Sequence, residues 1–134
     1  MTSHKLIVSL AFAASLAACS ANLHPADQME TVRTRLLGKW QARGSIFPKI
    51  FTSPHYTDTQ FEFFADGSVA ESGKSRSGWQ QERTGTFKFI DATHIKIDEG
   101  WMYGITIYEA DWQDNDHVTL HVADNLTLPL HRVN

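Results

Sequence analysis

Beyond residue 38, polar and apolar side chains alternate along the chain in short runs that end at turn residues. Successive side chains of a strand point to opposite faces of a sheet, so this alternation is typical of strands with one buried face. The runs 59–64 and 68–71 flank Asp66-Gly67, a dipeptide that favours a tight hairpin turn. The pattern therefore predicts consecutive antiparallel strands.

The alternation continues through residues 85–90 and 94–97, where phenylalanines and isoleucines share one face and lysines occupy the other. Residues 103–112 form a longer run, whose apolar phase slips between Ile107 and Tyr108 and so predicts a β-bulge. The last runs supply a further set of inward-facing residues: Val118, Leu120, Val122, Leu126, Leu128 and Leu130.

These runs predict a mainly β protein of about eight strands, an antiparallel up-and-down meander that closes into a small barrel. Closure buries the apolar face of such a sheet and removes its edges. One segment before the strands differs, because residues 26–37 place apolar side chains at helical spacing: Met29, Val32 and Leu36. Pro25 suits the first turn of a helix and Gly38 its end, so one short amphipathic helix precedes the barrel.

The first residues of the chain follow another pattern. A polar start containing Lys5 precedes eleven uncharged, mostly apolar residues, 6–16. A membrane-spanning helix needs roughly 20 such residues, so this run is too short for an anchor and is typical of a secretory signal peptide. It ends in Leu16-Ala17-Ala18-Cys19, which resembles the lipobox of bacterial lipoproteins, Leu-(Ala/Ser)-(Gly/Ala)-Cys, at all four positions.

In bacterial lipoproteins the cysteine thiol receives a diacylglyceryl group and the chain is cut before it. The resemblance therefore implies a signal peptide over residues 1–18, a lipidated Cys19 with a short tether over 19–25, and one domain over 26–134. The alternative is an ordinary secretory signal with an incidental cysteine, which would leave a free thiol in an exported protein. The serine that follows the cysteine, Ser20, resembles the pattern of lipoproteins that are sorted to the outer membrane. We therefore expect a lipid-anchored protein of the cell envelope, facing the periplasm where the cell has two membranes.

Charge narrows the possible partners. Removing Lys5 with the signal peptide leaves 11 cationic and 15 acidic side chains, a net charge of −4, where the full chain carries −3. A mildly acidic domain lacks the basic surface that nucleic-acid binding needs. It also lacks a basic face for anionic lipids, so we expect membrane attachment through the acyl chains on Cys19 alone.

Four short motifs occur in order along the predicted barrel: Gly38-Lys39-Trp40, Phe61-x-Phe63-x-x-Asp66-Gly67, Gly85-Thr86-Phe87 and Leu130-His131-Arg132. Together, over about residues 36–133, they resemble the small bacterial lipocalin-like (calycin) lipoproteins. The resemblance implies that Trp40 packs at the closed end of the barrel against Arg132. The chain is shorter than a typical lipocalin, so the interior either holds one small ligand or is filled by side chains.

An aromatic segment, residues 44–56, is interrupted by Pro48 and Pro54, which argue against a central strand. In lipocalin topology the first long loop covers the barrel mouth. The resemblance therefore implies an apolar lid for a ligand or partner, formed by Ile46, Phe47, Phe51 and Tyr56. The alternative is that these side chains only fill the core. The polar stretch 71–83 predicts an exposed hairpin, whose Trp79 either contacts a partner or folds back onto the barrel.

The histidines do not indicate a metal site. His117 and His121 are four residues apart in a predicted strand, so their Cα atoms lie about 13 Å from each other, too far to share one ion. They alternate with core residues and should face solvent, as should His94. A group of aspartates lacks the glycine and glutamate of an EF-hand loop: Asp111, Asp114 and Asp116. We expect no metal, no cofactor and no enzyme activity.

Two functions remain open. The first is a non-enzymatic envelope lipoprotein that binds a small apolar ligand or serves as an accessory protein of the envelope. The alternative is a protein-interaction module, such as an inhibitor or assembly factor, that uses its exposed loops. A dry cavity open at one end would favour the first, and a packed barrel with an apolar surface patch would favour the second.

Overall fold

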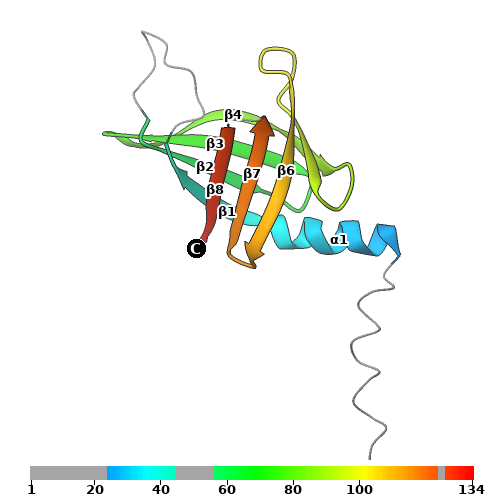
Figure 1. Ribbon diagram of the computed structural model, residues 1–134. Helices are drawn as coiled ribbons and strands as arrows, with labels where there is room; N and C mark the ends of the chain where they lie inside the picture. Colours follow the sequence, from blue (N-terminus) through cyan, green and yellow to red (C-terminus); the bar gives the residue numbers. More distant parts are fainter. Residues whose placement is uncertain (1–23, 45–55, 124–125) are drawn as a thin grey trace, which may run out of the picture.

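A computed structural model describes residues 24–44, 56–123 and 126–134. The predicted signal peptide, Cys19 and most of the tether lie outside these residues. The described part contains one helix followed by eight strands (Figure 1). Their bounds are α1 (Pro25–Leu36), β1 (Gly38–Arg43), β2 (Asp58–Phe63), β3 (Ser68–Ser75), β4 (Gly78–Phe89), β5 (His94–Asp98), β6 (Ile105–Asp114), β7 (His117–Ala123) and β8 (Leu126–Val133).

Each strand pairs antiparallel with the next one along the chain, and β1 pairs with β8, which closes the barrel. The closing register places Trp40 opposite Arg132 and Gln41 opposite His131. The prediction of a mainly β, up-and-down barrel of about eight strands after one short helix is therefore confirmed.

The core follows from the alternation along the strands. Phe61 and Phe63 on β2 point inward with stacked rings, and Phe63 meets Phe87 of β4 edge to face, with ring centres 5.0 Å apart. Tyr108 on β6 lies edge to face with Phe61. Aromatic pairs in these geometries add to the stabilisation from burial alone. The remaining buried apolar residues of this cluster are Leu36, Trp40, Ala42, Val69, Phe89, Ile95, Ile97, Ala110, Val118, Leu120, Leu128 and Leu130.

Helix α1 covers one end of the barrel. Its start is capped by the side chain of His24, which accepts a hydrogen bond from the backbone N–H of Ala26. Leu36 is fully buried, while Met29 and Val32 pack against the core from the same face of the helix. Figure 1 shows α1 crossing below the barrel, beside the β6–β7 turn. We call this the closed end.

Neighbouring strands run in opposite directions, so alternate connections meet at opposite ends of the barrel. The β2–β3, β4–β5 and β6–β7 turns belong to the closed end. The other end carries Tyr56, the β3–β4 turn at residues 76–77 and the β5–β6 loop at residues 99–104, and we call it the mouth. In Figure 1 the β5–β6 loop projects from the barrel on the side away from α1.

Strand β6 departs from the sequence prediction. The predicted bulge between Ile107 and Tyr108 is wrong, because alternation continues unbroken from Ile105 to Trp112. Ile105 and Ile107 lie on the outer face and are exposed, whereas Tyr108 and Ala110 are buried. The apparent slip came from treating every apolar residue as inward-facing.

The irregularities in register lie elsewhere. Between β3 and β4, Glu71 pairs with Arg83 but Ser72 pairs with Gln81, which leaves Glu82 as an extra residue in β4. The β6–β7 and β7–β8 pairings shift at Trp112/Asp114 and at His121/Ala123. The stretch 71–83 forms the far half of the β3–β4 hairpin, with a two-residue turn at 76–77. The tip of this hairpin is exposed, as predicted, whereas Glu71 and Gly73 at its base are buried.

Candidate functional site at the barrel mouth

At the closed end, the structure brings together the two residues implied by the lipocalin resemblance. The guanidinium carbon of Arg132 lies 4.3 Å from the ring centre of Trp40. The Nη1 and Nη2 atoms of Arg132 each donate a 2.7 Å hydrogen bond, to the carbonyls of Leu37 and Arg35 respectively. The indole N–H of Trp40 donates to the Leu36 carbonyl. These contacts fasten the end of α1 to the closing strands, so their role is structural.

At the mouth, an acidic side chain lies where an apolar one would be expected. Glu71 belongs to the inward-facing series of β3, after Val69 and before Gly73, and it is only 1% exposed. Neither of its carboxylate oxygens accepts a hydrogen bond from a donor in the described part of the chain. A buried carboxyl group without a donor is costly, so its position calls for an explanation.

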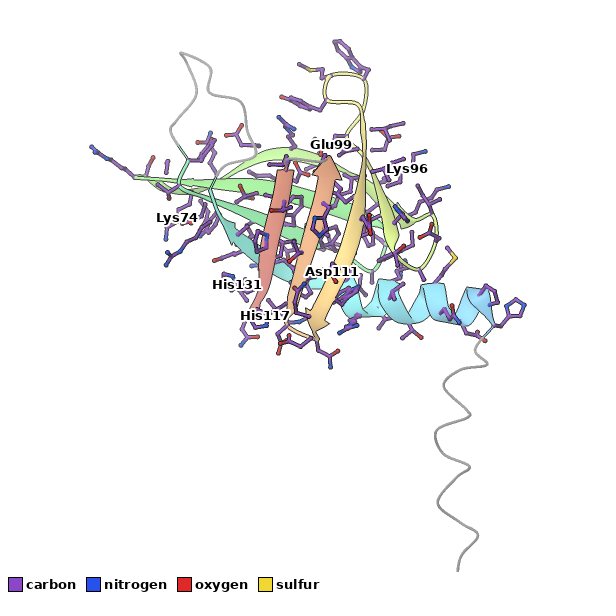
Figure 2. The ribbon with its side chains drawn as sticks, in the orientation of Figure 1. Lys74, Lys96, Glu99, Asp111, His117 and His131 are labelled. Carbon is purple, nitrogen blue, oxygen red and sulfur yellow. The ribbon has the colours of Figure 1, made fainter. Side chains whose placement is uncertain are left out.

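Two charged side chains stand beside Glu71. Arg83 is its register partner on β4, and the Nη1 atom of Arg83 lies 3.5 Å from Oε2 of Glu99. The side chain of Glu99 is 5% exposed and that of Arg83 is 19% exposed. Figure 2 shows Glu99 at the mouth, where the β5–β6 loop leaves the barrel.

Two tyrosine rings lie beside these charged side chains. The guanidinium carbon of Arg83 lies 4.3 Å from the ring centre of Tyr103, in the β5–β6 loop. The hydroxyl of Tyr56 donates a hydrogen bond to Glu82, the extra residue of β4. Bulges of this kind redirect side chains and are common next to functional sites.

Electrostatics explains how Glu71 is accommodated. Burial, together with its hydrogen bond to Glu99 and the charge of Glu99, raises the pKa of Glu71 to about 9, against the opposing effect of Arg83. Two ionised carboxylates can only accept hydrogen bonds, so the contact between Glu71 and Glu99 becomes a hydrogen bond when one of them carries a proton. A proton held between the two carboxyl groups therefore stabilises this contact, which favours the protonated form of Glu71. Burial, and then the charges of both glutamates, also raise the pKa of Tyr108.

Of the four predicted lid residues, the structure describes Tyr56. Its side chain is buried. A Cβ atom added to Gly73 would lie only 2.5 Å from Cγ of the Tyr56 ring. The lack of a side chain at Gly73 therefore permits this packing. Ile46, Phe47 and Phe51 lie outside the described residues.

The histidines of the turns have local roles. His94 contacts Asp91 and His117 contacts Asp114, each with a nitrogen–oxygen distance of 2.9 Å at an exposed turn. Hydrogen bonds from the Thr93 backbone and then from His94 lower the pKa of Asp91 to about 2. Figure 2 shows His117 and His131 near the closed end, and they are register partners on β7 and β8. The described residues contain no group of three His, Cys, Asp or Glu placed to hold a metal ion.

A second feature lies on the outside of the barrel. The β5–β6 loop exposes Trp101 at 94%, with Met102 and Tyr103 beside it, and the outer face of β6 adds Ile105 and Ile107. We call these five residues the outer apolar surface. Sequence reasoning missed it, although Gly100 and Gly104, both with positive φ, mark the turns on either side of the loop tip.

Glu71 was also missed, although its signal was present. Extending the alternation from Val69 through Glu71 to Gly73 places the glutamate on the inner face. An acidic residue in the inward phase of a strand is the signal that could have identified it.

Comparison of the chain with models of known protein families gives no match. Comparison with curated proteins likewise gives no significant match. Among the described residues, no helix combines the length and hydrophobicity required to cross a membrane.

Proposed function

We propose that this protein is a lipid-anchored lipoprotein of the cell envelope, whose small lipocalin-like barrel binds one small, largely apolar ligand at its mouth without converting it. An eight-stranded barrel is just wide enough to hold one small ligand. The observation that carries the proposal is Glu71, a buried carboxyl group beside Glu99 and Arg83 and close to tyrosine side chains. A few convergent polar groups with shifted pKa values in an otherwise apolar interior are typical of a binding site.

The membrane attachment in this proposal rests on the motif Leu16-Ala17-Ala18-Cys19. Each buried methylene of an acyl chain contributes about 0.8 kcal/mol, and two or more chains hold a protein stably at a bilayer. Ser20 supports sorting to the outer membrane where the cell has two membranes. The barrel would then face the periplasm, with its closed end joined to the anchor through α1 and a short tether.

The proposal is tested by purifying the mature protein gently from its own membrane and measuring its mass under native conditions. We expect a lipidated chain beginning at Cys19, together with a small molecule that dissociates on unfolding. A protein that is lipidated but consistently free of any small molecule would contradict ligand binding while leaving the anchor intact.

The alternative function is a protein-interaction module, and the outer apolar surface favours it. Exposed clusters of large apolar side chains often mark docking sites on soluble domains. In this case the native mass would include a second polypeptide, and that polypeptide would be lost on Trp101→Ser and Ile107→Thr. Retention of a small ligand by these variants would favour the mouth instead.

A further inference from the structure

We propose that the ligand of the barrel mouth carries a cationic head group, an amine or a guanidine on an apolar body, which binds between Glu71 and Glu99 in place of the Arg83 guanidinium. This inference rests on the proposed ligand-binding function and specifies the chemistry of the ligand. It follows from the charges gathered at the mouth, from the position of Arg83 and from the unfilled hydrogen-bonding capacity of Glu71.

Acidic side chains outnumber basic ones among the described residues of this site. Three acidic side chains come together here: Glu71 and Glu99 are within hydrogen-bonding reach of each other, and Glu82 follows the register shift beside Arg83. Arg83 is the cation that acts on the Glu71–Glu99 pair in the described part of the chain. Without its proton the Glu71–Glu99 pair would carry two negative charges against the one positive charge of Arg83, so a cationic ligand can take over the role of the proton, whereas an anionic ligand would meet repulsion.

The groups around the Arg83 guanidinium show how the site holds a cation. Its guanidinium has a carboxylate of Glu99 at 3.5 Å and the face of the Tyr103 ring at 4.3 Å. A carboxylate on one side and an aromatic face on another make an arrangement that binds organic cations. Arg83 is also the most exposed of the three charged groups at the centre of the site, so its place is the one that a ligand from solvent reaches with the least burial.

Glu71 has carboxylate oxygens that could accept hydrogen bonds from a ligand. Both of its oxygens lack a donor among the described residues, and its side chain is almost completely buried. An ammonium group offers three N–H donors, enough for both carboxylates, and hydrogen bonds between charged groups are about twice as strong as neutral ones. On binding, the proton shared by Glu71 and Glu99 would pass to solvent, and the ligand would take its place.

The test compares three ligands with the same tail and different head groups: hexylamine, hexanoate and 1-hexanol. Each is titrated by calorimetry into the full-length lipidated protein in phosphatidylcholine nanodiscs, with empty nanodiscs as the blank. We expect hexylamine to bind about tenfold more tightly than hexanol, the effect of at least one charge-assisted hydrogen bond, and hexanoate to bind most weakly.

Variants locate the effect. Glu71→Gln and Glu99→Gln keep the shape of the side chain and should reduce hexylamine affinity about tenfold, to the level of hexanol. Glu109→Gln, on the exposed outer face of β6, is the matched control and should change nothing. Arg83→Ala should strengthen hexylamine binding, because the competing internal cation is removed. A role of Arg83 in structure alone predicts no such gain. The melting temperature of each variant confirms that it is folded.

Other outcomes are equally decisive. Equal binding of all three ligands would overturn the inference of a cationic head group, and it would leave the proposed ligand-binding function standing. Preferential binding of hexanoate would show that the site binds an anionic head group and would overturn the inference. If hexylamine binds neither the wild type nor Arg83→Ala, the inference fails. The proposed function fails separately, if no small molecule accompanies the protein purified from its membrane.

Discussion

Trp40 and Arg132 face each other across the seam where β1 meets β8, with the guanidinium carbon 4.3 Å from the indole ring centre. Arg132 also donates a hydrogen bond to the carbonyl of Asn115 in the β6–β7 turn, in addition to the carbonyls at the end of α1. One side chain therefore links the helix, the closing seam and a distant turn.

Substitutions at this seam should be costly. Trp40 is completely buried, so Trp40→Ala should lower the free energy of unfolding by about 3–5 kcal/mol. Arg132→Ala should cost about 2–3 kcal/mol, because it loses hydrogen bonds to backbone carbonyls and the contact with the ring. Urea denaturation measures both. If the two single variants unfold at wild-type urea concentrations, the seam does not hold the barrel closed.

Stability should fall as the pH rises, and Glu71 should be the cause. Its pKa is higher in the folded protein than in the unfolded chain, so its stabilising contribution is complete below the ordinary pKa of 4.5 and is lost as the pH rises towards 9. Within this window the free energy of unfolding should fall by up to about 1.4 kcal/mol per pH unit. Urea titrations between about pH 5 and pH 8 measure this slope.

Glu71→Gln should flatten that slope, since the amide does not titrate. Glu109→Gln, exposed on the outer face of β6, should retain it. A wild-type slope that persists in Glu71→Gln would assign the pH dependence to another group.

Gly73 should not tolerate a side chain. In Gly73→Ala the new Cβ would lie 2.5 Å from Cγ of Tyr56, so the ring must move or the strands must separate. We expect a loss of about 1–3 kcal/mol. The loss should be much smaller when Tyr56→Ala is already present, and a double-mutant cycle measures this coupling. Additive effects of the two substitutions would show that the ring and the glycine are independent.

Cys19 should carry a lipid in the native host. Intact mass should show a mature chain that begins at Cys19 and carries the mass of a diacylglyceryl group. Cys19→Ala should lose this mass and partition away from membranes. A mature protein with an unmodified Cys19 thiol would contradict the lipobox interpretation.

The strands and the faces of most of their residues could be predicted from the sequence because alternation is a local property. Phe61, Phe63, Phe87 and Phe89 lie inside as the two-residue period requires. Barrel closure also followed, since a long meander with one apolar face has few other ways to bury it. The helix was placed to within one residue at each end by its spacing and by Pro25.

The mouth could not be predicted in the same way. Assigning polar residues outward and apolar residues inward fails at Glu71, which is buried, and at Ile105 and Ile107, which are exposed. Local rules commonly fail where a protein has a functional site. The contact between Glu71 and Glu99 depends on how β4 is aligned with β3 on one side and with β5 on the other, and on the extra residue in β4. No local pattern in the sequence specifies these alignments.

The barrel is closed by strand β8, Leu126–Val133, which pairs with Lys39–Gln41 of β1, at least ninety positions earlier in the chain. Until β8 has been synthesised, β1 and β7 each present an unpaired edge, and pairing between distant segments is the slow part of folding. A chain that stops short of β8 should therefore leave the edges of β1 and β7 open to pairing with other chains, and it should aggregate more readily than a chain that contains β8.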